Sequence, residues 1–276
     1  MSSSKAPSRY DWPLRRVALL LGVLAWLGLL LVVPLIAMAW HVLDLGLGQA
    51  WHEMAESGAS QALWRSVWLA VLAVVVNGAL GVLAAIVLVR HRFPGRRLLD
   101  WMVDLPLAVS PVMIGLAYIL VFGRGGLLEP LLLGTGWKVT FAWPGLVLGT
   151  VFVTIPFTTR EVGHVLRELG TTEEQAAATL GASTWKTFWK VTLPNIRHGL
   201  TYGATLTMAR SLGEFGAVMV LGGAIAGKTD TATVFIYAAM ESRFEAASYG
   251  MALVLAALTM ALLAFLKALQ PSSPEV

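Results

Sequence analysis

The segment TTEEQAAATLGASTWKTFWKVTLP, residues 171–194, predicts a short helix that a glycine brings to an end. Thr171 and Glu174 have the spacing of a capping box, in which a hydroxyl and a carboxylate each bond a backbone N–H at the start of a helix. The alanine-rich run that begins at Gln175 favours helix, and Gly181 suits the left-handed conformation that commonly follows one. We therefore expect a helix of about two turns ahead of Gly181.

The remainder of this segment predicts a second helix. Ser183 or Thr184 can cap its start, and Pro194 is expected to end it. Four side chains recur at helical spacing and would share one face: Trp185, Phe188, Trp189 and Thr192. We call residues 171–194 the elbow. Two interpretations fit it, a rigid knob onto which another protein docks and an amphipathic hairpin that lies on lipid.

Apolar sequence surrounds the elbow on both sides. Of the 276 residues, 57% are hydrophobic and 13% are charged, whereas soluble domains carry about 25% charged residues. A helix that crosses a membrane needs about 20 apolar residues. Six segments are candidates, near residues 17–40, 64–89, 101–122, 143–159, 200–222 and 248–269. The sequence therefore predicts an all-α, polytopic membrane protein with six transmembrane helices.

These segments divide the chain into regions. Residues 1–60 would hold an N-terminal cytoplasmic tail, the first transmembrane helix and an external loop. Residues 61–269 would form the transmembrane core, with a cytoplasmic loop at 161–198, and residues 270–276 would be a C-terminal tail. The first span also resembles a cleaved signal peptide, but its apolar run is longer than the usual stretch of about 7–15 residues. We expect an uncleaved helix.

The basic residues predict the orientation in the membrane. Fourteen lysines and arginines lie on the side of the two termini and the elbow, and four lie on the other side. The positive-inside rule then places both termini and the elbow in the cytoplasm. Because these residues flank apolar segments, the net charge of +4 is interpreted as a topology signal, and no nucleic-acid partner is expected.

The segment GGAIAGKT, residues 222–229, matches the pattern of a phosphate-binding loop. Such a loop follows a strand and leads into a helix, whereas this segment follows a predicted transmembrane helix and faces outward. We expect an external turn and no ATP site. The chain has no cysteine and its five histidines lack metal-ligand spacing, so no metal site is expected. No nucleophile with a neighbouring base is evident, and no catalytic residue is expected.

Two charged residues lie within the fifth predicted span. Arg210 and Glu214 are four residues apart, so they would share a helix face and can pair. Charges inside a membrane are costly and are often functional. One interpretation is a pair that locks the bundle together. The other places Arg210 on the path of an anion, with Glu214 weakening its hold and with Ser211 and Gly213 leaving room for a polar passage.

The third predicted span contains Pro106 and Pro111 on either side of Ser110. Proline frees a carbonyl group inside a helix, and a broken helix is tolerated in a membrane where it is buried or lines a cavity. These three residues are therefore a candidate gate on the path, and a packing kink is the alternative. Asn77 in the second span is expected to bond a neighbouring helix.

The elbow resembles the EAA loop of ABC importer permeases. The family pattern is Glu-Ala-Ala, three residues, Gly, nine residues, Ile, any residue and Leu-Pro, and residues 175–194 follow it except for Gln175 and Val191. In that family the loop forms coupling helices that sit in a cleft of a cytoplasmic ATPase. The resemblance implies that the coupling residues are Glu174, Gln175, Ala176, Ala177, Gly181, Ala182, Leu193 and Pro194. Gln175 removes a charge that could pair with the partner.

Four more stretches resemble the permeases of sulfate and molybdate importers, namely HRFPGR at 91–96, LPLAVSPV at 105–112, FAWPG at 141–145 and ARSLGEFGAV at 209–218. The six-span length, the N-terminal span and LPNIR at 193–197 are most similar to the W-type permease of sulfate/thiosulfate importers. The resemblance implies a type I ABC importer permease fold in a bacterial cytoplasmic (inner) membrane.

The same resemblance implies a set of partners. These are a second, related permease chain, two copies of a cytoplasmic ABC ATPase, a periplasmic sulfate-binding protein and membrane lipid. ATP and magnesium would bind in the ATPase, and no cofactor would bind in this chain.

Three alternatives stay open. A molybdate or tungstate permease shares the ARSLGEFGA stretch. A secondary transporter driven by an ion gradient often has broken helices and internal repeats, although no clear repeat is evident here. A membrane scaffold without a transport role would need no charge inside the membrane.

Overall fold

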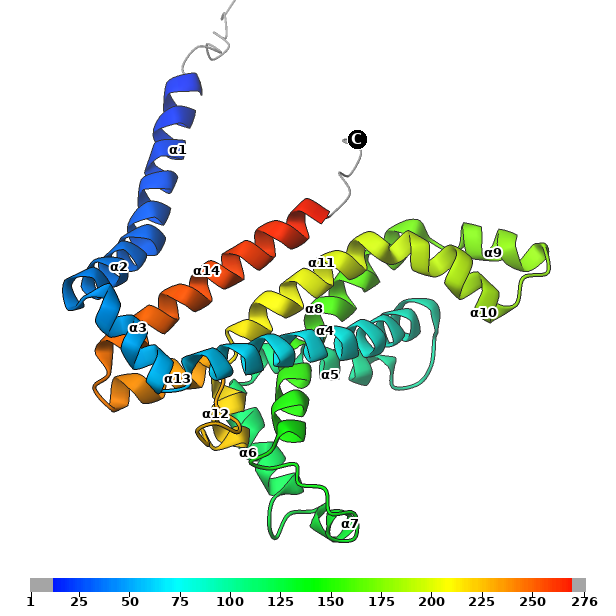
Figure 1. Cartoon of the computed structure of the whole chain (residues 1–276). Coiled ribbons are helices and arrows are strands. Elements are labelled where there is room, and N and C mark those ends of the chain that lie inside the picture. The colour runs from blue at the N-terminus through cyan, green and yellow to red at the C-terminus, as the bar shows by residue number, and fades with distance from the viewer. Residues whose placement is uncertain (1–11, 270–276) are drawn as a thin grey trace, which may run out of the picture.

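The computed structural model describes residues 12–269, which are mostly helical and contain no β-strand (Figure 1). The first half contains α1 (Trp12–Leu27), the π-helical segment η1 (Gly28–Val32), α2 (Val33–Leu45), α3 (Leu47–Glu56), α4 (Ala59–Arg90), α5 (Arg96–Ala108), α6 (Pro111–Phe122) and α7 (Glu129–Leu133). The second half contains α8 (Trp143–Leu169), α9 (Thr172–Thr179), α10 (Thr184–Thr187), the π-helical segment η2 (Phe188–Thr192), α11 (Leu193–Leu212), α12 (Gly216–Gly222), α13 (Ala232–Glu241) and α14 (Glu245–Leu269). The all-α class is confirmed, and the predicted C-terminal tail and residues 1–11 lie outside the described residues.

Helix α4 is the centre of the bundle and packs against α8 and α11. A Cβ atom on Gly81 would lie only 2.9 Å from the Cβ of Thr158, so the absence of a side chain permits the close approach of α4 to α8. Asn77 is buried and donates hydrogen bonds to the carbonyl oxygen of Val151 at 3.2 Å and to Oγ1 of Thr154 at 2.7 Å. The expected contact of Asn77 with a neighbouring helix is confirmed, and it fixes the register of α4 because a buried amide without partners is costly.

Buried hydroxyl groups continue this polar contact along α8. Thr150, Thr154 and Thr158 recur at every fourth residue and are fully buried. The hydroxyl of Thr158 lies 3.2 Å from that of Thr207 on α11. Such hydroxyl contacts join helices in surroundings where water is absent. Toward the elbow the same interface becomes apolar, in a cluster of Val82, Ala85, Val162, Leu166 and Ile196.

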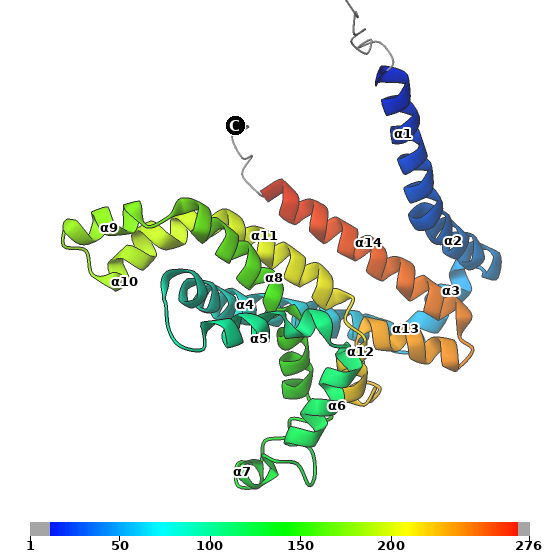
Figure 2. The ribbon, with the colours of Figure 1, turned by 180° about the vertical axis from the view of Figure 1, so that it is seen from behind.

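The N-terminal and C-terminal helices form the other side of the molecule. Helix α14 packs against α13, α3 and α2, and its buried residues join those of α4 and α13 in one apolar cluster. Helix α1 stands away from the bundle in both views of the ribbon (Figures 1 and 2). The apolar side chains of its described part, from Val17 to Leu27, are exposed, and such a helix must contact lipid or another chain in a membrane.

Three helices of the described chain are long and apolar enough to cross a membrane, namely residues 16–45, α4 and α14. The pair α5 and α6 is a fourth if it is counted as one span, although it is bent by 117°. The predicted span 143–159 lies within α8, which continues to Leu169. The predicted span 200–222 is divided between α11 and α12, so the prediction of one continuous helix there is wrong. The count of six spans stays a prediction.

Candidate functional site: the elbow and two broken helices

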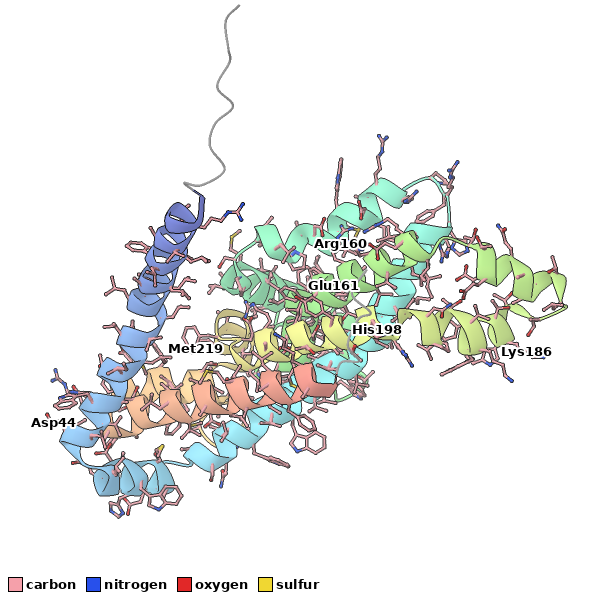
Figure 3. All side chains as sticks on the ribbon, turned by 90° about the horizontal axis from the view of Figure 1, so that it is seen from above. Asp44, Arg160, Glu161, Lys186, His198 and Met219 are labelled. Carbon is pink, nitrogen blue, oxygen red and sulfur yellow. The ribbon has the colours of Figure 1, made fainter. Side chains whose placement is uncertain are left out.

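The elbow projects beyond the end of the bundle, and Lys186 lies near its far tip (Figure 3). Gly181 ends α9 in the left-handed region with φ +79°, and open space surrounds its Cα. Ser183 precedes α10, and its hydroxyl accepts a hydrogen bond from the backbone N–H of Lys186 at 3.4 Å. The predicted arrangement of two short helices joined at Gly181 is therefore confirmed.

The predicted capping box at the start of α9 is wrong. Thr171 makes no cap bond, and its hydroxyl instead accepts a hydrogen bond from Nε2 of Gln175 at 3.1 Å. Glu174 turns toward the bundle, where its Oε2 lies 3.0 Å from Nε of Arg90 at the end of α4. A mostly buried guanidinium attracts the carboxylate more strongly than an exposed N–H does, because burial lowers the local dielectric constant.

The prediction that Pro194 ends the second helix is also wrong. Helix α10 continues through η2 directly into α11, and Pro194 lies in the first turn of α11. A proline inside a helix lacks an N–H and presses on the carbonyl group four residues earlier. The wider π-helical turn just before Pro194 accommodates both defects. The elbow is therefore continuous with a helix of the bundle.

The elbow presents large apolar side chains on its surface. Leu180 is 89% exposed and Trp185 is 70% exposed. Trp185 stacks on Phe188 with 6.2 Å between ring centroids, and Phe188 in turn packs against the bundle. The residues that the resemblance assigns to coupling divide into an exposed set, Gln175, Ala176, Gly181 and Pro194, and a partly buried set, Glu174, Ala177, Ala182 and Leu193. Leu180 and Trp185 are therefore accessible to another molecule at this end of the bundle.

The first broken helix is the pair α5 and α6. Pro106 is buried inside α5, and Ser110 is exposed and extended at the break. Pro111 occupies the first position of α6, where its missing N–H has no partner to lose. The expectation of a break between the two prolines is confirmed, and α6 turns away from the direction of α5 by 117°.

Two aspartates of α5 hold this half of the break against α8. Arg160, which is labelled in Figure 3, reaches from α8 to both of them. Its Nη2 lies 2.5 Å from Oδ2 of Asp104, and its Nη1 lies 2.6 Å from Oδ1 of Asp100. Arg160 is one of the basic residues that predict the orientation in the membrane, and its attachment to α5 could not be predicted from the sequence pattern.

The second broken helix is the pair α11 and α12, with Glu214 between them. Oε2 of Glu214 lies 2.7 Å from Nη1 of Arg210, so the predicted pair is confirmed. The prediction that the two residues share a helix face is wrong, because α11 ends at Leu212. Oε1 accepts a hydrogen bond from the backbone N–H of Ala217 at 3.1 Å, in the first turn of α12. The backbone carbonyl of Glu214 accepts a further bond from the hydroxyl of Thr233 at 2.7 Å. The first of these bonds satisfies one N–H at the start of α12 and the second satisfies a carbonyl group at the break, so both favour a break over one helix across 200–222.

The two broken helices lie against each other. A Cβ atom on Gly216, at the start of α12, would lie 3.1 Å from the Cβ of Pro111 and 3.2 Å from the backbone N of Val112. Ile114 and Ala217 then pack together in one buried cluster. The candidate gate at residues 106–111 and the candidate anion path at residues 210–214 are therefore brought into one region by the fold.

Ser211 and Gly213 contribute differently to this region. The hydroxyl of Ser211 is buried and has no hydrogen-bond partner within the described residues. Gly213 is exposed, and the nearest atoms to a Cβ there are 3.9 Å away. The room that the sequence predicts at these two positions thus exists at Gly213 and is absent around Ser211.

The segment 222–229 is a turn between two helices. Helix α12 precedes it, and α13 begins only at Ala232. The hydroxyl of Thr229 donates to the carbonyl oxygen of Gly222 at 2.7 Å and accepts from the backbone N–H of Ile225 at 3.1 Å. The prediction that a helix and no strand precedes this segment is confirmed. Thr229 is occupied by bonds that close the turn on itself.

Two arginines of α4, Arg65 near its start and Arg90 at its end, form ion pairs that the sequence does not predict. Arg65 pairs with Asp230 just beyond the turn, with Nη2 2.6 Å from Oδ1, and Arg90 pairs with Glu174. A basic residue near each end of one long apolar helix is the only signal in the sequence. Within residues 12–269, no three histidine, aspartate or glutamate side chains gather as a possible metal site.

Comparisons with known proteins agree with this architecture. The profile of the family described as "Binding-protein-dependent transport system inner membrane component" matches residues 77–273. The chain is 42% identical over 251 residues to the sulfate transport system permease protein CysW of Synechococcus elongatus, a match that covers 91% of this chain and 87% of that protein. It is 37% identical over 242 residues to the sulfate transport system permease protein CysT of Escherichia coli, which covers 88% of this chain and 87% of that one.

A solved structure has a similar fold. It is that of a bacterial ABC transporter involved in the import of the acidic polysaccharide alginate. One of its chains superposes with a TM-score of 0.75 over 94% of this chain and 95% of that chain, at 18% sequence identity. The similarity in fold therefore extends over nearly the whole length of both chains.

Proposed function

The chain belongs to the family of binding-protein-dependent transport system inner membrane components, and on that basis we propose that it is the transmembrane permease subunit of an ATP-driven sulfate importer. Its fold is that of the type I ABC importer permeases. The observation that carries the proposal is the elbow, which continues into α11 and presents Leu180 and Trp185 beyond the end of the bundle. A pore that opens without a separate ATPase would need no projecting segment of this kind.

The membrane topology is part of this proposal. Six spans in a bacterial inner membrane would consist of residues 16–45, α4, the pair α5 and α6, α8, the pair α11 and α12, and α14. The bias of basic residues supports a cytoplasmic location for both termini and for the elbow. The division into a region at 1–60, a core at 61–269 and a tail at 270–276 follows from the same topology.

The elbow would seat in a cleft of a separate cytoplasmic ATPase. Small residues at Ala176 and Gly181 are exposed and let a partner surface approach closely, while Leu180 offers an apolar contact. Hydrolysis of ATP with magnesium would take place in that partner, two copies of which would serve the complex. This chain would contribute motion of its helices and no catalytic residue, and no cofactor would bind to it.

The region where the two broken helices meet would be the translocation path. Arg210 is 35% exposed at its side chain, so its guanidinium can contact a passing anion, whereas the paired Glu214 is fully buried. The carboxylate would weaken the hold of Arg210 on a dianion, and transport requires sites that release their ligand. Ser110 and Gly213, one at each break, are exposed and would leave space for a hydrated ion.

The substrate and the remaining partners follow from the relatives. Both of the relatives above are named as permeases of sulfate transport systems, and the higher identity to CysW supports the same role here. CysT carries a different name from CysW, which supports a second, related permease chain as the other half of the pore. A periplasmic sulfate-binding protein would deliver the anion, and lipid would surround the exposed spans.

One experiment tests the assignment. The complex is purified through a tag on this chain, its components are identified, and it is reconstituted in liposomes with the binding protein and radiolabelled sulfate. We expect an ATPase and a second permease to co-purify and uptake to require ATP. Uptake that follows an ion gradient without ATP would instead indicate a secondary transporter. Competition by thiosulfate, molybdate and tungstate then ranks the oxyanions.

A further inference from the structure

We propose that Arg90 is a positioning residue that joins the elbow to α4, so that a displacement of the elbow moves α4 and the turn at its opposite end. The proposal rests on the proposed function, since it concerns how the elbow transmits work. It gives a role to two groups of paired charges whose presence the membrane topology alone does not explain. We call Arg90, Glu174 and Thr192 the inner clamp, and Arg65 with Asp230 the outer clamp.

The inner clamp joins the first turn of α9 to the last residue of α4. The carboxylate of Glu174 faces Arg90 with both oxygens, Oε2 at 3.0 Å from Nε and Oε1 at 3.4 Å from Nη2. The hydroxyl of Thr192 in η2 donates to Oε1 of Glu174 at 3.0 Å. A two-oxygen contact with a planar guanidinium fixes direction as well as distance. Both halves of the elbow are therefore held at one point.

The same arginine also contacts the bundle. Nη1 of Arg90 donates to the carbonyl oxygen of Leu166 at 3.0 Å, in the last turns of α8. The side chain of Arg90 is 14% exposed and that of Glu174 is 24% exposed, so water screens the pair only partly. Arg90 thus connects α4, α8 and the elbow, whereas peptide continuity alone connects the elbow only to α8 and α11.

The outer clamp repeats this arrangement at the start of α4. Nε of Arg65 donates to the backbone carbonyl of Asp230 at 2.8 Å, and Nη1 donates to that of Gly227 at 3.3 Å. The two side chains of the ion pair are 12% and 10% exposed. Helix α4 contains no proline, and Arg65 and Arg90 lie 25 residues apart on it, a separation of about 38 Å at 1.5 Å per residue. A continuous helix that is held at two points in this way transmits a displacement from one clamp to the other.

The position of Glu174 indicates that it holds the elbow against α4 and does not itself dock to the ATPase. Its neighbour Gln175 is exposed and bonds Thr171 within the elbow, so the partner ATPase would meet an amide there. The negative charge of Glu174 is turned inward and is neutralised by Arg90. An isolated pair of this exposure contributes little to stability, so its main consequence is the fixed geometry of the elbow.

The test compares Arg90→Gln with the matched control Arg92→Gln in the whole complex. Within residues 12–269, Arg92 is exposed and makes no hydrogen bond or ion pair, so the control removes the same charge two residues away. The readouts are co-purification of the ATPase, ATP hydrolysis stimulated by the binding protein, and sulfate transported per ATP hydrolysed. For Arg90→Gln we expect normal co-purification and a ratio lowered about fivefold, with no change for the control.

The charge exchange Arg90→Glu with Glu174→Arg should restore part of the lost ratio. An unchanged ratio in Arg90→Gln, or an equal loss in Arg92→Gln, overturns the proposal. Loss of the ATPase from the Arg90→Gln complex also overturns it, because the residue would then serve docking. If the wild-type complex imports no sulfate, the proposed function is wrong. That result can be told apart from failure of the Arg90 proposal, because it is obtained without any change at Arg90.

A distance measurement tests the clamp without transport. The chain has no cysteine, so a pair of spin labels can be placed at Thr179→Cys in α9 and Leu83→Cys in α4 without background. Both positions are exposed. We expect one narrow distance distribution in the wild type and in Arg92→Gln, and a broader one in Arg90→Gln. Equal widths in all three would show that Arg90 does not position the elbow.

Discussion

The elbow and the second broken helix each contain an arginine paired with a glutamate, but the two pairs are buried in opposite ways. In the elbow the arginine is the more buried partner, with Arg90 14% exposed against 24% for Glu174. In the break the glutamate is fully buried, while Arg210 is 35% exposed. Glu174 stays bonded to Arg90 and to Thr192, whereas the guanidinium of Arg210 is open to a further contact.

This difference explains what each region can offer. The elbow keeps its charged pair against the bundle and presents Leu180 and Trp185 outward, which suits contact with a protein surface. The break caps α12 with Glu214 and leaves the guanidinium of Arg210 accessible, which suits brief contact with an anion. Four substitutions test the comparison, in order of their expected effect on the stability of the purified complex.

The largest effect is expected for Arg210→Leu. This change leaves the carboxylate of Glu214 buried without its partner, and breaking a buried pair costs about 3–5 kcal/mol. The same change at Arg90 should cost about 1 kcal/mol or less, since Glu174 can be solvated. Thermal unfolding of the two purified complexes measures the difference. The double variant Arg210→Leu with Glu214→Gln should recover part of the loss, and equal melting temperatures for the two single variants would break the comparison.

The next effect is expected for Gly216→Val. A Cβ atom there would lie 3.1 Å from Pro111, so the two broken helices must separate, and overpacking of this kind costs about 1–3 kcal/mol. Sulfate uptake should fall with it because both candidate path segments shift. The control is Gly213→Val, which has no atom nearer than 3.9 Å. If both variants unfold at the same temperature, the start of α12 is not tightly packed against the start of α6.

A smaller effect on stability is expected for Gly181→Ala. The residue has φ +79° and open space around it, so the alanine introduces only the strain of a left-handed residue, about 1–2 kcal/mol. That strain acts within the elbow, and transport per ATP should fall while the bundle stays folded. Gly136→Ala is the matched control, because it has φ +69° and open space but lies in the connection before α8. Uptake should fall only for Gly181→Ala.

The smallest effect on stability is expected for Leu180→Ser. The side chain is 89% exposed, and surface substitutions usually change stability by no more than about 0.5 kcal/mol. Retention of the ATPase during purification should nevertheless decrease, since an apolar contact is removed from the proposed interface. Leu127→Ser is the control, because Leu127 is 82% exposed in the connection between α6 and α7. Equal retention in both variants would mean that Leu180 faces no partner.

The features that could be predicted from the sequence are those that depend on neighbouring residues. The apolar runs indicate helices, Gly181 indicates the stop between two of them, and the prolines at 106 and 111 indicate a break. The pairing of Arg210 with Glu214 follows from their spacing of four residues. Each of these depends on local propensity or on contacts within about one turn of helix, so they can be read without knowing the fold.

The wrong predictions concern residues with competing partners. The spacing of Thr171 and Glu174 favours a capping box, but Arg90, 84 residues earlier, takes the carboxylate. Pro194 favours a helix end, but the π-helical segment before it and the packing of Leu193 against the bundle keep the helix continuous. In both cases contacts between distant segments replace the arrangement that the local sequence favours.

The sequence by itself determined that this chain is a helical membrane protein with a jointed elbow and with Arg210 paired to Glu214, because hydropathy and turn chemistry act over short distances along the chain. Only the tertiary structure decided that the two broken helices meet at Gly216 and Pro111, and that α4 ends in a clamp at each side. Those contacts join residues from about 80 to more than 160 positions apart. Which distant groups meet depends on how the helices pack, and no local pattern encodes that choice.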